Sequence, residues 1–170
     1  MAETETSAAD EALWGFSLAF YALPGVAAAL IELQDRDGLD VNLMLFALWL
    51  GITGRSRLDN DQLTKAEQVI GSIRTDVVEP LRTLRRNLKY SRDDDVLRLR
   101  EEVKKLELAG ERLVQTRLAR LAEKFTANGS AESRRSAALA NLTLYIGAEK
   151  AGAGEATVIR KALDRYMREN

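Results

Sequence analysis

Apolar residues recur at intervals of three and four through most of the chain, the spacing that places side chains on one face of an α-helix. Residues 61–79 show this clearly, with Leu63, Ala66, Ile70 and Ile73 following the period. Alternating β-branched residues, which are typical of strands, are scarce, and the sequence holds only two prolines. The pattern predicts an all-α protein that is helical nearly throughout.

Capping and breaking residues divide the pattern into about seven helices. Pro24 suits the first turn of a helix that ends near Asp35, Gly38 suits a turn, and Asp40 suits the N-cap of the next helix. The expected helices are one capped by Ser7, then 24–35, 41–52, 61–79 with a continuation past Pro80, a long helix from Ser91 to Phe125, 131–149 and 155–168.

The longest helix should pair with the one before it. Apolar residues on it have mostly the spacing of one helical face: Val96, Leu99, Val103, Leu106, Gly110, Leu113, Leu118, Leu121 and Phe125. In the segment SRDDD before it, Ser91 can cap the helix, and Asp93 to Asp95 then lie in the first turn, where the helix dipole favours anions. We therefore expect a long central helical hairpin.

A single-domain helical bundle is the expected organisation, because 170 residues suit one domain. Aromatic residues concentrate in the first 52 positions, whereas residues 53–126 are heavily charged. We expect a disordered tail at 1–7 and one helical domain at 8–168. Its parts would be an apolar N-terminal lobe (8–52), a charged long-helix region (60–126) and C-terminal helices (131–168).

Residues 12–31 carry no charge over twenty positions, about the length of a membrane span. Pro24-Gly25 should break the run, and its flanks, Glu11 and Glu32, provide no basic anchor. Two buried helices are the favoured interpretation, and a membrane-facing hairpin is the alternative. Because the first ten residues hold no Lys or Arg, no signal peptide is expected, and we predict a cytoplasmic protein.

Composition excludes several kinds of chemistry. The chain has no Cys and no His, which removes thiol nucleophiles, Cys/His zinc sites and imidazole acid–base catalysis. The 25 basic and 26 acidic residues nearly balance, so no whole-chain attraction to nucleic acid is expected. Nor is any cofactor expected.

Residues 14–50 resemble a bacterial helical family that carries only a domain-of-unknown-function label. The resemblance rests on Trp14, the YALPGV stretch at 21–26, Leu33-Gln34-Asp35, the Gly38-x-Asp40-Val41-Asn42 turn and the Leu45-Phe46…Trp49 run, with a fainter similarity at 80–89. It implies a small all-helical bacterial protein and brings no established activity with it.

The first candidate site is the aspartate turn formed by Asp35, Asp37 and Asp40. Its spacing does not match the calcium loop, in which glycine is sixth and a glutamate is twelfth. A looser Mg²⁺ site or a set of catalytic bases is one hypothesis; ordinary turn chemistry, with Asp40 as a cap, is the other. Since an anion at a helix C-terminus is disfavoured, Asp35 should need a nearby arginine.

The second candidate is a basic face formed by Arg82, Arg85, Arg86 and Lys89, which recur at helical spacing. It would bind a protein partner or an anion. The alternatives are a solvated face or ion pairs with Asp35 and with the aspartates at 93–95.

Aromatic residues supply the third candidate, because Trp14, Tyr21, Phe46 and Trp49 could line an apolar groove instead of the core. The glycine-rich loop at 151–154 lacks the other features of a phosphate loop and is expected to be a turn. We expect no metal centre.

From these features we predict a non-enzymatic protein-interaction or adaptor protein that uses the apolar lobe and the basic face around Arg85. The alternative is a metal- or anion-dependent helical enzyme that uses the aspartate turn and the basic face. A nucleic-acid binder ranks third. Membrane contact is not expected, and a homo-oligomer is compatible with the pattern.

Overall fold

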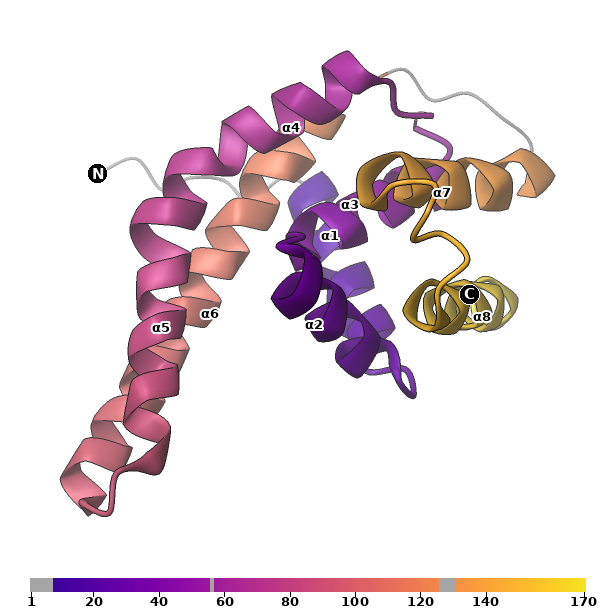
Figure 1. The fold of residues 1–170 in the computed structure, drawn as a ribbon. Helices are drawn as coiled ribbons and strands as arrows, with labels where there is room; N and C mark the ends of the chain where they lie inside the picture. The colour runs from indigo at the N-terminus through magenta and orange to yellow at the C-terminus, as the bar shows by residue number, and fades with distance from the viewer. Residues whose placement is uncertain (1–7, 56, 126–130) are drawn as a thin grey trace.

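The computed structural model describes residues 8–55, 57–125 and 131–170 and confirms the all-α prediction (Figure 1). The helices are α1 (Ala8–Tyr21), α2 (Val26–Asp37), α3 (Val41–Ile52), α4 (Asn60–Ile73), α5 (Glu79–Asn87), α6 (Asp94–Ala122), α7 (Ala131–Ile146) and α8 (Gly154–Glu169), with a π-helical segment η1 (Arg74–Val78) and a 3₁₀ turn η2 (Leu88–Tyr90). The segments α4, η1 and α5 form one unbroken rod. If this rod is counted as one helix, the described residues contain the seven helices that were predicted. The tail at 1–7, the cap at Ser7 and the turn at 128–130 lie outside the described residues.

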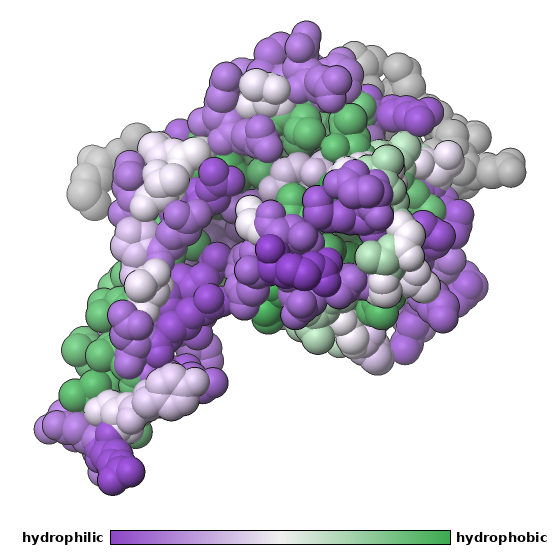
Figure 2. Space-filling view, viewed as in Figure 1, coloured by the Kyte–Doolittle hydropathy of each residue, from purple (hydrophilic) through white to green (hydrophobic). Residues whose placement is uncertain are grey.

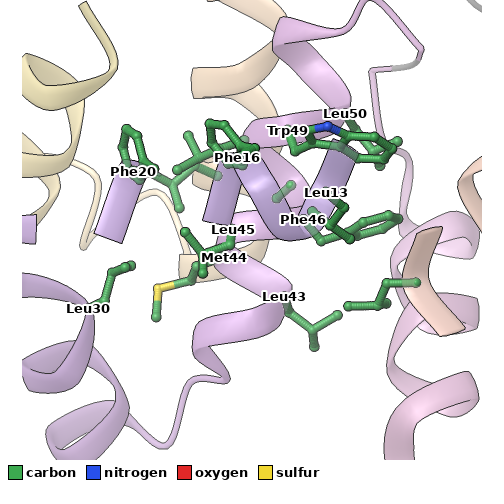
Figure 3. Packing of buried hydrophobic residues seen from close by; sticks show 14 of the residues in the cluster. Leu13, Phe16, Phe20, Leu30, Leu43, Met44, Leu45, Phe46, Trp49 and Leu50 are labelled. Carbon is green, nitrogen blue, oxygen red and sulfur yellow. The ribbon is translucent and has the colours of Figure 1, made fainter. Parts of the chain in front are cut away.

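Helix α3 is the centre of the molecule. Residues 42–51 are all buried, since α1, α2, α6 and α7 pack around this helix on every side. A helix surrounded in this way has no polar face, which explains the sequence LMLFALWL. Figure 3 shows Phe46 and Trp49 of α3 packed among leucines and beside Leu13 and Phe16 of α1.

Helices α3 and α7 cross at very short range. A Cβ atom built at Gly51 would lie 2.1 Å from the backbone nitrogen of Ala138. Beside this crossing, the buried side chain of Asn141 donates to the Ala47 carbonyl at 3.1 Å and accepts from the Leu58 backbone N–H at 2.7 Å. The close approach depends on small residues, and Asn141 satisfies two backbone groups that burial would otherwise leave unpaired.

The joints on either side of α2 combine a confirmed prediction with a correction. Gly38 ends α2 in the left-handed region at φ 70°, and the Asp40 carboxylate caps α3 by accepting from the Asn42 and Leu43 backbone N–H groups, as predicted. Pro24, however, does not start the second helix. It lies in the turn before Gly25. Gly25 is the N-cap, with φ 80°, and α2 begins at Val26.

Helices α4, η1 and α5 form one rod that runs antiparallel to α6, which gives the expected hairpin. The far half of this hairpin extends beyond the other helices as an arm (Figure 1). The π-helical turn at 74–78 directly precedes Pro80, which lacks the N–H of a regular helix. A π turn is a common way to absorb such a break without ending the helix. The predicted cap of α6 shifts from Ser91 to Asp93, which accepts from the backbone of Asp95 at 2.8 Å.

The predicted apolar stripe on α6 is only partly buried. Val103, Gly110 and Leu118 face the interior, but Leu99, Leu106 and Leu113 are exposed, while Glu107 and Gln115 are buried. The reason is that α6 packs against α4, η1 and α5 on one side and against α1 and α3 on another, and these leucines lie on neither side.

No single helix within the described ranges has the length and apolar composition to cross a membrane. Helices α1 and α2 together satisfy those two criteria, but they meet at a bend of 99°.

Candidate functional site

A pocket of about 510 Å³ lies between the arm and the N-terminal helices, where the surface in Figure 2 is hollowed. We call it the arm pocket. Helices α1, α2 and α3 line one side, and α5 and α6 line the other. Its apolar walls are formed by Trp14, Leu18, Tyr21, Leu45 and Leu108, among others. Polar side chains from α5 and α6 face these walls.

A network of charged side chains joins α5 and α6 along one wall of the pocket. Arg85 donates two hydrogen bonds to the Glu107 carboxylate, and Arg82 donates to the same carboxylate at 3.2 Å. Arg82 also contacts Glu111 and donates to the Gln34 side chain at 2.9 Å. Two arginines thus face two glutamates at the edge of the interior, where charges are stable only when paired.

The pKa values of the two glutamates are shifted in opposite directions. Burial would raise the pKa of Glu107, but hydrogen bonds and charge from Arg85 and then Arg82 outweigh it and hold that pKa below its usual range. At Glu111 burial dominates and raises the pKa, although Asn42 and Arg82 oppose the shift. Burial, together with the charge of Glu111, also raises the pKa of Tyr21.

A chain of amides continues from Glu111 into the core. The Asn42 side-chain amide donates to Glu111, and its oxygen accepts from Gln115 Nε2 at 3.0 Å. Gln115 and Ser17 are both 4% exposed, and both line the pocket. In the described part of the chain, Gln115 Oε1 and Ser17 Oγ have no hydrogen-bond partner. Buried polar atoms are normally paired, so these two atoms call for a physical explanation.

The three predicted aspartates have separate surroundings. Asp35 pairs with Arg86 at 3.0 Å, which supplies the arginine expected for that helix end and lowers the Asp35 pKa. Asp37 pairs with Arg36, and Asp40 caps α3, where burial raises its pKa. Among the residues with assigned positions, no group of three or more acidic side chains is arranged to hold a metal ion.

The predicted basic face points toward the body of the protein. Arg82 and Arg85 pair with glutamates of α6 and Arg86 pairs with Asp35, whereas the Lys89 ammonium lies 5.5 Å from the ring of Tyr90. Three of the four predicted residues therefore line the arm pocket, and Lys89 does not.

The predicted aromatic set divides in two. Trp14 and Tyr21 line the arm pocket, and the guanidinium of Arg112 lies 4.9 Å from the Trp14 ring centre. Phe46 and Trp49 are 1% and 2% exposed and belong to the core around α3. The apolar lobe and the basic face, predicted separately, meet in one pocket.

Sequence reasoning missed Glu107, Glu111, Gln115 and Asn42. Hairpin register was the available signal, because Glu107 and Glu111 are one turn apart on α6, and Arg82 and Arg85, which pair with them, are about one turn apart on α5. An antiparallel hairpin brings two such pairs together. Asn42, within an otherwise apolar helix, gave no comparable signal.

A family model covers the part of the chain that forms this pocket. Residues 12–118 match the model of a family described as a protein of unknown function (DUF2390). The chain belongs to this family. All the residues that line the arm pocket, from Trp14 to Gln115, fall within the matched region, whereas α7 and α8 lie outside it. The match also extends beyond residues 14–50 and 80–89, on which the resemblance in the sequence rests. No curated protein and no solved structure matches the chain.

Proposed function

We propose that this is a non-enzymatic protein-interaction protein and that the outer face of its arm is the docking surface. The outer face consists of five aliphatic residues that are 40–59% exposed: Val77, Leu84, Leu99, Leu106 and Leu113. Monomeric proteins rarely expose a large contiguous patch of apolar side chains. This exposure is the observation that supports the proposal.

Helical spacing places the outer face on the side of the arm opposite the pocket. Leu99, Leu106 and Leu113 recur every seven residues on α6, and Val77 and Leu84 do so on the rod beside it. Glu107, one residue beyond Leu106, points instead to Arg82 and Arg85. Figure 2 shows apolar atoms gathered along the edge of the arm.

A second copy of the same arm is the partner that this surface fits. Leu99 and Leu113 lie seven residues on either side of Leu106, and Asp95 and Arg117 lie eleven on either side. A two-fold axis at Leu106 would set each Leu99 against the partner's Leu113 and each Asp95 against an arginine. The outer face is therefore complementary to a second copy of itself when two arms pack antiparallel, whereas parallel packing would put like charges together.

The basic face enters this proposal only indirectly, because Arg82, Arg85 and Arg86 are paired within the protein. In our proposal the Arg86–Asp35 pair and the hydrogen bond from Arg82 to Gln34, which join α5 to α2, hold the arm at a fixed angle to the body. Bacterial origin and a cytoplasmic location belong to the same proposal.

A small-molecule helical enzyme is the second candidate. The observation that favours it is Glu111, a pocket carboxyl whose pKa is raised by burial, since perturbed carboxyls cluster at catalytic sites. The aspartate turn does not contribute to this candidate, because none of Asp35, Asp37 and Asp40 lines the pocket. A Glu111→Gln variant that folds and loses a defined turnover would favour this candidate over the first.

We expect Leu106→Glu to convert a dimer to a monomer, raising its dissociation constant at least about tenfold, because each copy would bury a charge in the interface. Sedimentation equilibrium over a concentration series measures this. Leu108→Glu is the matched control: Leu108 lies two residues away and is 54% exposed against 59% for Leu106, but it faces the pocket. A wild-type chain that stays monomeric throughout the series would contradict self-association.

Charge reversal at Asp95 and Arg117, which flank the leucines of the outer face on α6, tests the antiparallel arrangement. Asp95→Lys should weaken the dimer about fivefold, since lysine would then face Arg117 of the other copy. Adding Arg117→Glu in the same chain should restore the affinity. If the double variant dimerises no better than Asp95→Lys alone, the two arms do not pair antiparallel about Leu106.

A further inference from the structure

We propose that the arm pocket binds a small neutral molecule with an apolar body and a hydroxyl or N–H donor. The inference is independent of self-association, because the pocket and the outer face lie on opposite sides of the arm. Three features carry it: the shape and lining of the pocket, two unpaired polar atoms in its buried part, and the internal balance of its charges.

The size and lining of the pocket suit a small organic molecule. A volume of about 510 Å³ falls within the usual range for such sites, which are mostly apolar with a few placed polar groups. Trp14, Tyr21 and Leu108 offer two rings and an aliphatic surface. A ring or a short alkyl chain would bury apolar area against them.

The hydrogen-bond chain determines which atom of Gln115 is left over. The Glu111 carboxylate accepts from the Asn42 amide nitrogen, so the Asn42 oxygen must face Gln115. That oxygen accepts from Gln115 Nε2, and among the described residues Gln115 Oε1 remains as an acceptor without a donor. The atom that completes the chain must therefore carry a hydrogen, as a hydroxyl or N–H group does.

Ser17 provides the second unpaired group. Its side chain is almost fully buried on α1, and its hydroxyl can donate or accept. In the middle of a helix, a serine hydroxyl commonly bonds back to a carbonyl of the preceding turn, but Ser17 Oγ makes no such bond. A ligand hydroxyl, which is both donor and acceptor, can pair with either group.

The charges around the pocket favour a neutral ligand. Arg82 and Arg85 are paired with Glu107 and Glu111. Arg86 pairs with Asp35 at 3.0 Å, and Lys104 at the rim approaches Glu101 at 3.8 Å. An anion or cation entering the pocket would have to displace one of these partners, which costs more than placing a neutral group.

Three probes of nearly equal size test the ligand class: 4-propylphenol, propylbenzene and 4-propylbenzoate. Binding is followed by ligand-detected NMR and by Trp14 fluorescence, with Trp49 as an internal background because it is buried in the core. We expect the phenol to bind at least about fivefold more tightly than propylbenzene, the worth of about one hydrogen bond. The benzoate should bind more weakly than either.

Two variants locate the binding. Ser17→Ala should fold normally and lose several-fold affinity for the phenol, with propylbenzene affinity unchanged. Leu108→Glu should abolish binding of both neutral probes, whereas Leu106→Glu, on the other side of the arm, should leave binding as it is. The proposal is overturned if no neutral probe binds, if the benzoate binds best, or if the phenol binds no more tightly than propylbenzene.

Discussion

Replacing Gly51 by alanine should destabilise the fold by at least about 3 kcal/mol, although helix propensity predicts the opposite. Within a helix alanine is favoured over glycine by about 1 kcal/mol. At this position, however, the added Cβ would lie 2.1 Å from the nitrogen and 2.2 Å from the Cα of Ala138. Both are backbone atoms of α7, so the two helices must separate, which costs packing along the whole central crossing.

Chemical denaturation of the wild type and of Gly51→Ala measures the effect, with Gly71→Ala as the matched control. Gly71 lies within α4, and a Cβ there would meet no atom within 4 Å. We expect Gly71→Ala to stabilise the protein by about 0.5–1 kcal/mol, as propensity alone predicts. A neutral or stabilising Gly51→Ala would show that α3 and α7 do not cross as closely as described.

Replacing Glu107 by glutamine should also have a large effect and lower the free energy of unfolding by about 3 kcal/mol. Glu107 is 7% exposed and balances two arginines, so its loss removes the ion pair of Arg85 and one of the two ion pairs of Arg82. Removing one partner from a buried charged network typically costs 3–5 kcal/mol, and the partial exposure of the arginines places this case at the low end. Denaturant unfolding at neutral pH measures the difference.

The pH dependence of that difference identifies its cause. The folded-state pKa of Glu107 lies below the ordinary value of 4.5, so the carboxylate contributes its full stabilisation above that value. As pH falls through the folded pKa, the contribution is lost. The gap between wild type and Glu107→Gln should therefore shrink from pH 7 to about pH 3.

Glu111, whose raised pKa acts in the opposite direction, is present in both proteins. Glu102→Gln is the control, since Glu102 is exposed on the same helix and pairs only with Lys105 among the described ion pairs. Its effect should stay within about 0.5 kcal/mol. A gap for Glu107→Gln that is constant with pH would point to lost packing instead of lost charge.

The sequence determined the helices and several of their ends, because these depend on local interactions, although the start of α2 and the cap of α6 differ from the prediction. Periodic apolar residues, the left-handed Gly38 and the Asp40 cap act within a few residues of themselves, and all three were correctly predicted. The pairing of Asp35 with an arginine followed from the helix dipole, which is also a local property.

Tertiary structure alone decided which side of the hairpin faces inward. The leucines of α6 suggested a buried stripe at 99, 106 and 113, yet the chain buries Glu107 and Gln115 and leaves those leucines in solvent. A periodic pattern shows that a helix has two faces, but not which face meets the body or where an arm extends beyond it. The arm pocket depends on that choice, because its groups come from five helices and acquire their pairing and their shifted pKa values only when those helices meet.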